Sequence, residues 1–401
     1  MYKLIILGLS FLIIGNVSAQ STTKPTDTAH SKPNEWYKKI QFRGYSQVRY
    51  NRLFETNPKL KCEQCDRSWG DNGGFFFRRL RLIFYGNISE RVYIYIQPDF
   101  ASTANTGNLH FGQIRDAYFD LALDKKKEYR LRVGQSKVPY GFENMQSSQN
   151  RLALDRNDAL NSAVSNERDL GVFFYYAPAK IRERFDYLVK SGLKGSGDYG
   201  MFAFGAYNGV TANRPEDNDS LHIVSRITYP FKLKNGQIIE AAIQGFTGSN
   251  KITTTSAKTK NGLVAFKDNR VAATLVVYPQ PWGFQSEWTW GTGPQFQSSD
   301  TSIRQQNLTG GYVQSMYYIK FGKQTLIPFT RYQYYKGGKK HEVDARSYIV
   351  SEWEIGAEWQ PIPNFELVAM YTVSSRTFQD AALPINSQTG RLLRLQAQFN
   401  F

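Results

Sequence analysis

From Gln41 onward the chain alternates between apolar and polar positions, and the last strand-like run shows this best. One set of alternate positions there is apolar: Leu393, Leu395, Ala397, Phe399 and Phe401. The positions between them are polar: Arg394, Gln396, Gln398 and Asn400. A period of two places successive side chains on opposite faces of a strand, so the pattern predicts β-structure with one apolar face.

Sixteen segments carry strand-like patterns, most of them about the ten residues that a tilted membrane strand requires. Helical periodicity is almost absent. Segment 184–193 is the exception, because Phe185, Leu188 and Val189 have helical spacing; we interpret it as a short helix or irregular stretch within a turn. The strand candidates are 41–50, 75–86, 91–100, 111–123, 128–137, 170–178, 199–208, 221–230, 237–246, 264–278, 282–291, 307–319, 325–336, 350–360, 364–375 and 391–401.

The gaps between these segments fall into two length classes. Gaps after odd-numbered strands are long, and gaps after even-numbered strands are short except for 179–198. Short periplasmic turns alternating with long extracellular loops are typical of membrane barrels. The sequence therefore predicts an all-β fold, a 16-stranded antiparallel transmembrane β-barrel with both termini in the periplasm. The long gaps are 51–74, 101–110, 138–169, 209–220, 247–263, 292–306, 337–349 and 376–390.

The predicted strand 350–360 indicates which face meets lipid. Its apolar side carries Trp353, Ile355, Ala357 and Trp359. Its other side carries Glu352, Glu354 and Glu358. A charged side chain facing lipid at the membrane midplane costs about 2–4 kcal/mol, so the glutamates are expected to face a wet lumen and the tryptophans the bilayer. A soluble barrel would reverse this sense.

The same parity assigns a set of arginines to the lumen, where they form a basic wall around the closure of the barrel. Acidic residues fall on other strands, and opposed charged walls would focus a field on passing ions. An open alternative is that these arginines only satisfy polar partners inside a wet interior. Arg78 and Arg115 have the wrong parity for the lumen, which places them at the outer rim or indicates a slip of register. The predicted pore-lining basic residues are Arg43, Arg49, Arg79, Arg81, Arg130, Arg132 and Arg394.

The N-terminal residues 1–19 have the features of a secretory signal. Lys3 precedes an apolar run that is too short to span a bilayer, and Val17-Ser18-Ala19 forms a small-residue cleavage site. Residues 20–40 are polar and contain proline, so a flexible periplasmic lead-in is expected before the barrel domain, 41–401.

Composition adds a basic balance and many aromatic residues. Removing the signal removes one lysine, which leaves 49 basic against 34 acidic residues, or +15. This charge indicates an anionic partner, and export argues against nucleic acid. The 25 Tyr and 27 Phe suit a barrel whose aromatic side chains line the membrane interfaces.

The only two cysteines, Cys62 and Cys65, form a CxxC pair. In an oxidising compartment a local disulfide is the favoured interpretation. A structural zinc site usually takes four ligands, and this pair supplies two, so no metal site is predicted; no cofactor is predicted either.

Several segments together resemble the phosphate-selective porin O and P family. They are FRGYSQVRY (42–50), FFFRRLRLIFYGNISERVYIYIQPDFA (75–101), IRDAYFDL (114–121), LRVGQSKVPYGFEN (131–144), ERDLGV (167–172) and GAYNG (205–209). The resemblance implies a trimeric sixteen-stranded porin whose third extracellular loop, here 138–169, folds into the lumen and carries arginines and lysines that draw anions through. It also implies that Phe401 serves as an assembly signal for the barrel-assembly machinery.

Charge in the expected constriction departs from a phosphate-selective pattern. The candidate constriction cations are Lys137, Arg151, Arg156 and Arg168. Four carboxylates balance them: Glu143, Asp155, Asp158 and Glu167. Because a carboxylate repels phosphate while an arginine binds it, this neutral segment supports a mild anion preference better than phosphate selection.

The function expected from these features is passive diffusion of small solutes, with a preference for anions, across the outer membrane of a Gram-negative bacterium. An enzyme is not expected, because the four histidines, His30, His110, His222 and His341, have no companion motif such as GxSxG. The alternative is a scaffold whose long loops, or segment 179–198, bind another envelope protein. Surrounding outer-membrane lipid is an expected partner in either case.

Overall fold

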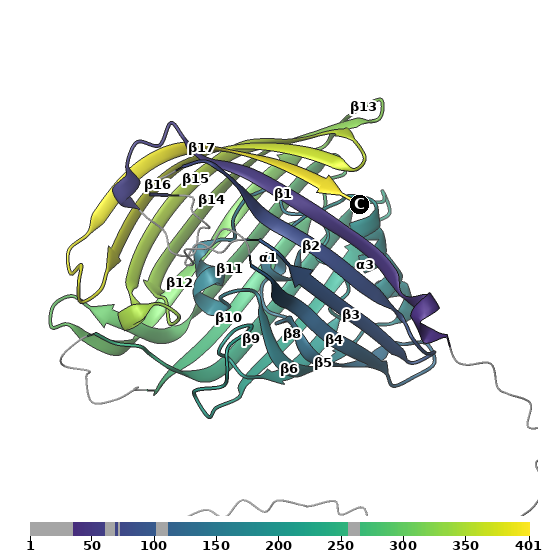
Figure 1. The fold of residues 1–401 in the computed structure, drawn as a ribbon, viewed down its shortest axis with the longest axis horizontal. Coiled ribbons are helices and arrows are strands. Elements are labelled where there is room, and N and C mark those ends of the chain that lie inside the picture. Colours follow the sequence, from purple (N-terminus) through teal and green to yellow (C-terminus); the bar gives the residue numbers. More distant parts are fainter. Residues whose placement is uncertain (1–34, 61–68, 71–72, 102–110, 256–264) are drawn as a thin grey trace, which may run out of the picture. The chain divides into compact units, whose positions relative to one another are not determined.

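All strands of the described chain belong to one antiparallel sheet that closes on itself, because the first strand pairs with both the second and the last. The structure is a computed structural model that describes residues 35–60, 69–70, 73–101, 111–255 and 265–401. Residues 36–401 form one compact unit. Closure leaves no unpaired edge, which is the condition for a sheet to cross a bilayer. Figure 1 shows the barrel and the segments inside it.

Seventeen strands are assigned in the described residues, and they make sixteen barrel staves because β12 and the three-residue β13 both pair with β14. All sixteen predicted strands are confirmed. The strands are β1 Gln41–Leu53, β2 Phe75–Asn87, β3 Val92–Asp99, β4 Gln113–Ala122, β5 Tyr129–Lys137, β6 Arg168–Tyr176, β7 Phe202–Tyr207, β8 His222–Lys232, β9 Ile238–Lys251, β10 Ala265–Val277, β11 Trp282–Gln297, β12 Ser302–Tyr317, β13 Ile319–Phe321, β14 Gln324–Gly338, β15 Ser347–Ile362, β16 Phe365–Gln379 and β17 Ser387–Asn400.

Helices are few and short. The segment with helical spacing forms α3, Ala179–Lys190, whose Ile181, Phe185 and Leu188 are buried. Within the described residues, no helix is both long enough and apolar enough to cross a membrane. The remaining helical pieces are α1 Phe142–Met145, α2 Asp158–Ala163, and the 3₁₀ turns η1 Trp36–Lys39, η2 Pro58–Leu60 and η3 Val343–Ala345.

The lead-in and the loops differ in part from expectation. The end of the predicted flexible lead-in forms η1 instead. The predicted long loop 292–306 is wrong, because β11 and β12 continue as a paired hairpin and leave only 298–301 as the turn. The predicted signal 1–19 and the pair Cys62 and Cys65 lie outside the described residues.

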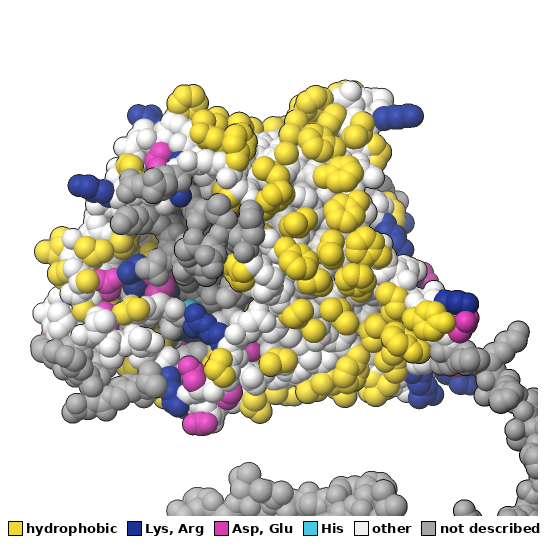
Figure 2. Space-filling view, viewed as in Figure 1, with side chains coloured by type: hydrophobic (Ala, Val, Ile, Leu, Met, Phe, Trp, Pro, Cys, Tyr) yellow, Lys and Arg dark blue, Asp and Glu magenta, His cyan; other side chains and the backbone are white. Residues whose placement is uncertain are grey.

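The lipid-facing parity is confirmed. Trp353 and Ile355 of β15 are exposed, whereas the intervening Glu354 is fully buried inside the barrel. Along β17, Leu395 and Phe399 are exposed and Arg394 is buried. Figure 2 shows hydrophobic side chains gathered over the outer face of the front strands, with Lys and Arg side chains toward the two ends of the barrel.

Candidate functional site

The segment 138–167, between β5 and β6, lies inside the barrel and contacts widely separated staves. On one side, the Tyr45 hydroxyl of β1 lies 2.7 Å from the Ser148 hydroxyl. On another, the backbone N–H of Phe142 donates to the Glu287 carboxylate of β11. This segment, called the inner loop below, contains α1 and α2 and is the third loop on the outer side. The inward folding that the family resemblance implied is therefore present.

Asp155 fastens the inner loop to the strands that close the barrel. Its carboxylate accepts from Arg49 of β1 at 3.2 Å and is also ion-paired with Arg394 of β17. Arg49 donates a further hydrogen bond, 2.9 Å long, to the Leu154 carbonyl oxygen. Both arginines are buried, so two predicted pore-lining side chains act as anchors for the loop.

Two other carboxylates of the inner loop face the opposite wall. Glu143 pairs with Arg331 of β14 at 2.5 Å. Asp158 pairs with Lys339 at 2.5 Å and with Arg376 of β16 at 2.9 Å. The formal charges of the loop sum to zero, but two of its carboxylates therefore neutralise cations of the far wall and not cations of the loop itself.

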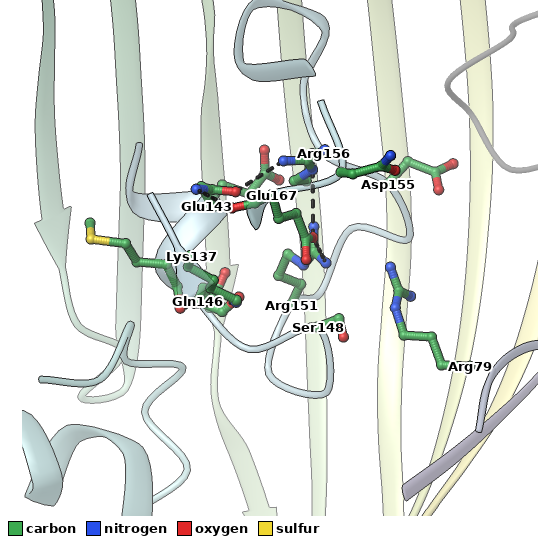
Figure 3. Close-up of polar contacts among 12 residues, drawn as sticks. Arg79, Lys137, Glu143, Gln146, Ser148, Arg151, Asp155, Arg156 and Glu167 are labelled. Atoms are coloured by element: carbon green, nitrogen blue, oxygen red, sulfur yellow. Dashed lines mark hydrogen bonds and ion pairs between the residues drawn. The ribbon is translucent and has the colours of Figure 1, made fainter. Parts of the chain in front are cut away.

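The remaining loop carboxylate, Glu167, is surrounded by cations. Arg151 lies 2.8 Å away, Arg156 3.6 Å and Arg115 of β4 3.7 Å, and Arg168 is also ion-paired with it. Figure 3 shows Glu167 close to Arg151 and Arg156, with Arg79 of β2 pointing into the same space as Arg151 and Ser148. We call Glu167 and its four arginine partners, together with the nearby Lys137 and with Asp116, the Glu167 cluster.

The Glu167 cluster carries a net positive charge. Arg168 also pairs with Asp116 at 2.9 Å. The Lys137 ammonium donates to the carbonyl oxygens of Met145 and Gln146, at 3.2 and 2.8 Å. Counting the formal charges of these groups gives five cations against two carboxylates, or +3. The cluster comprises Arg115, Lys137, Arg151, Arg156, Arg168, Glu167 and Asp116. All four predicted constriction cations belong to it.

The cations fix the charge of Glu167. Burial by itself would raise the pKa of Glu167, but the surrounding cations, above all Arg151 and Arg168, hold this pKa well below its ordinary value. The pKa of Asp158 is likewise lowered, because Arg376 and Lys339 outweigh burial. Both carboxylates therefore stay ionised in mildly acidic solution.

This ionisation predicts that the inner loop keeps its arrangement on mild acidification. A carboxylate with a depressed pKa stabilises the folded state above its unfolded pKa, about 4.3 for Glu, and loses that contribution only as pH falls through the folded pKa. Single-channel conductance should therefore be the same at pH 5 and pH 4. A conductance step with a midpoint near the ordinary pKa of Glu would contradict the ion pairing of Glu167.

Two β-bulges turn Arg78 and Arg115, which have the wrong parity for the lumen in a regular strand, into the lumen. In the β1–β2 ladder Gln47 pairs with Arg79 and Val48 with Phe77, so Arg78 is the extra residue. In the β3–β4 ladder Arg115 is extra in the same way, and its guanidinium reaches Glu167. A bulge re-aims side chains locally, which a strict period of two cannot show. Arg115 is thus a site residue that the sequence pattern missed.

Two of the predicted pore-lining arginines have no carboxylate partner among the described residues. Arg79 donates to the Gln47 side chain at 2.8 Å, and among the described residues no carboxylate lies within ion-pair distance of it. Arg43 stacks over the Tyr85 ring at 5.5 Å, also without a carboxylate partner in the part of the chain that the structure describes. No described carboxylate balances the charge of these two side chains, which is what the prediction expected of the whole wall.

Three other arginines of the wall are neutralised by carboxylates of the barrel. Arg81 pairs with Asp99 at 2.8 Å. Arg132 binds the Asp120 carboxylate with two hydrogen bonds, of 2.7 and 2.9 Å, and Arg130 pairs with Asp198 at 2.8 Å. The alternative interpretation, that arginines satisfy partners in the interior, is correct for these three.

A periplasmic segment also enters the lumen. After α3, Lys194 pairs with Glu358 of β15 at 2.6 Å, and its carbonyl oxygen accepts from Gln146 of the inner loop at 2.7 Å. The turn 177–201 thus meets the inner loop from the opposite end of the barrel. Its length was visible in the sequence, but the contact was not predicted.

This arrangement can select ions by charge and size, and it provides no assembled catalytic group. No cluster of three or more potential metal ligands occurs among the described residues. His222, the first residue of β8, is fully buried, with its ring nitrogen 3.2 Å from the Ser249 carbonyl oxygen.

Comparisons with known proteins support the interpretation of this chain as a porin. The sequence profile described as phosphate-selective porin O and P matches residues 61–401. A comparison with curated protein sequences gives no match.

Three solved structures have a similar fold. The outer membrane channel DcaP of Acinetobacter baumannii has a TM-score of 0.55 at 14% identity, covering 90% of this chain and 97% of that one. The anion-selective porin from Comamonas acidovorans has a TM-score of 0.53 at 9% identity, covering 90% and 99%. The trimer form of OmpT from Vibrio cholerae has a TM-score of 0.52 at 10% identity, also covering 90% and 99%. With the profile match over most of its length, the chain belongs to the phosphate-selective porin O and P family and is an outer-membrane channel, not an enzyme.

Proposed function

We propose that this porin passes small solutes by passive diffusion and prefers anions. The observation that carries the proposal is the net charge of +3 in the Glu167 cluster, five cations against two carboxylates, at the inner loop. Arg79 adds a charge with no carboxylate partner among the described residues. Cations on low-dielectric walls attract anions and repel cations along a narrow path.

The test is the reversal potential of the purified protein in a planar bilayer under a potassium chloride gradient. Stepwise conductance with chloride more permeant than potassium is the expected result. A reversal potential that shows potassium to be more permeant than chloride would overturn the anion preference but would leave the proposal of a channel standing. Absence of conductance steps would overturn channel activity as well.

Inorganic phosphate is proposed as one of several permeant anions, without a dedicated tight site. Glu167 places a carboxylate beside Arg151 of the inner loop, and Asp155 places one beside Arg49 of β1. A carboxylate repels a phosphate that approaches the same guanidinium. Phosphate added to a chloride-conducting channel should therefore reduce the current only at millimolar concentration. Block at micromolar phosphate would show a tight phosphate site instead.

A homotrimer is the proposed assembly. The family resemblance supports it, and so does the trimer form of the similar Vibrio cholerae protein. Mass measurement of the purified protein by light scattering tests it, and a stable monomer would refute it.

We further propose that Phe401 directs insertion through the barrel-assembly machinery. Its backbone exchanges hydrogen bonds with Gly44 of β1, and its ring lies so close to Gly44 that an added Cβ would meet it at 2.6 Å. The exposed ring also stacks on Phe399. The last residue thus helps to close the barrel and remains accessible from outside.

Changing Phe401 to alanine should lower the inserted, heat-modifiable fraction several-fold in cells, because both the contact and the aromatic terminus are lost. Semi-native gel electrophoresis measures that fraction. The Phe401→Trp variant retains an aromatic terminus and should insert normally. Normal insertion of Phe401→Ala would remove the proposed role.

A further inference from the structure

Three loops at the outer end of the barrel enclose a polar cavity of about 240 Å³, which we call the mouth cavity. The loops follow β7, β9 and β14, and β14 is several strands away from the other two in the sheet. Figure 2 shows side chains of both charges gathered at this end, on the left of the view. The lining of the mouth cavity includes Arg214, Asp217, Asn250, Lys340, His341 and Val343.

Hydrogen bonds between the loops hold the walls of the mouth cavity in place. The Asn250 side-chain N–H donates to the Gly209 carbonyl oxygen at 3.1 Å, which joins the end of β9 to the loop after β7. The backbone N–H of Asp344 donates to the Thr253 carbonyl oxygen at 2.8 Å. The Asp344 carboxylate accepts in turn from the backbone N–H of Thr255 at 2.7 Å. The cavity is therefore preformed, and a solute that binds there does not have to order these loops.

Two neutral polar side chains of the lining have unused hydrogen-bonding capacity. Asn250 is 5% exposed, and its Oδ1 atom accepts no hydrogen bond from the described residues. The His341 ring also has no hydrogen-bond partner in the part of the chain that the structure describes. A neutral imidazole carries one donor and one acceptor. Because a buried polar atom without a partner is unfavourable, these two groups favour a solute whose own polar groups reach them.

The charged side chains of the lining balance one another, unlike those of the Glu167 cluster. Three of them are held in ion pairs: Lys251 with Asp219 at 3.6 Å, Lys340 with Asp268 at 2.8 Å and Glu342 with Arg346 at 3.6 Å. The other two, Arg214 and Asp217, are exposed and have no ion-pair partner among the described residues, and their formal charges sum to zero. A lining without net charge gives an anion no advantage over an uncharged solute.

A monosaccharide matches these features. Its hydroxyl groups both donate and accept, so they satisfy the Asn250 Oδ1 atom, which needs a donor, and the Arg214 guanidinium, which needs an acceptor. The cavity volume of about 240 Å³ corresponds to about eight waters at ~30 Å³ each, which suits a single sugar ring. Val343, which is exposed, supplies an apolar contact for the C–H groups of the ring.

We propose that the mouth cavity binds a neutral monosaccharide on the outer side of the constriction. A second cavity of about 10 Å³, the size of one water, shares Lys340 and His341 with the mouth cavity and is also lined by Arg168 of the Glu167 cluster. The sugar therefore binds next to the cluster. Uncharged sugars are then a class of solute in addition to anions, and their binding does not depend on the proposed anion preference.

Saturation-transfer difference NMR of the purified protein in detergent tests the proposal, with glucose, galactose, mannose and N-acetylglucosamine as separate probes. At least one of these sugars should bind at millimolar concentration. Asn250→Leu should weaken this binding about tenfold, because a sugar hydroxyl loses its acceptor. Val343→Trp fills the cavity without removing a hydrogen bond and should also weaken binding, so the test stays decisive if Asn250→Leu does not fold.

The matched control is Asn269→Leu, which removes an exposed asparagine from β10 and should keep the parental sugar signal. Absence of a signal from all four sugars would overturn the proposal, and so would a signal that both cavity variants retain. Stronger binding of gluconate or of glutamine than of any sugar would show an anion site or an amino acid site instead. The chloride current measured without sugar tests the proposed anion preference separately, so the two proposals fail independently.

Discussion

Replacing Arg79 with alanine is expected to remove a large part of the anion preference. Arg79 is bonded to Gln47, and no carboxylate lies in ion-pair range of it among the described residues, so no described anion cancels its charge. A unit charge about 6 Å from an ion in water contributes ~0.7 kcal/mol. Its loss should change anion and cation entry by about threefold each, in opposite directions. The reversal potential in a potassium chloride gradient measures this change.

Two further variants separate local charge from net charge. Lys323→Ala removes the same charge from an exposed periplasmic turn and should leave the reversal potential unchanged. Arg79→Lys keeps the charge and should keep most of the preference. An Arg79→Ala channel as anion-selective as the parent would mean that the current does not pass this wall.

The strand number and the lipid-facing parity could be predicted because both rest on local patterns. Sixteen staves follow from segment lengths and gaps, and a charge on the lipid face is strongly disfavoured, so Arg394 had to face inward. The hairpin 292–306 was missed for a related reason. Where β11 and β12 rise beyond the bilayer, both faces meet water, and a polar run such as Gln295 to Arg304 no longer shows the alternation.

The bulges at Arg78 and Arg115 mark the limit of parity. One extra residue in a ladder reverses the inward sense locally, and nothing in the residue pattern distinguishes it from a strand that simply ends. The sequence pattern left Arg115 outside the predicted lumen-facing cations, although this side chain lies 3.7 Å from Glu167.

The charge of the constriction could not be predicted by summing the loop. Each loop carboxylate finds its partner through the folded path of the chain: Glu143 meets Arg331, Asp155 meets Arg49 and Glu167 meets Arg151. Only the last of these pairs lies within one loop. A neutral segment therefore leaves one region positive, because its other carboxylates are held by distant strands.

Changing Asp155 to asparagine should loosen the inner loop and alter conductance more than any other single loop substitution. The carboxylate joins the loop to Arg49 and Arg394, which are 1% and 2% exposed. Removing one partner of a buried ion pair costs about 3–5 kcal/mol, because the remaining charge stays buried. The strand ladder does not involve this side chain, so the barrel should still insert. We expect a higher single-channel conductance with more open-channel noise.

The matched control is Asp217→Asn, which removes an exposed carboxylate from another outer loop and should leave conductance and noise unchanged. A second variant, Asp155→Glu, retains the charge and should stay close to the parent. Because Asp155→Asn also removes a negative charge, anion preference should rise together with conductance. If preference rises while conductance and noise stay at parental values, Asp155 contributes only charge, and the other contacts of the inner loop, such as the Glu143 and Asp158 ion pairs on the far wall, are enough to hold it in place.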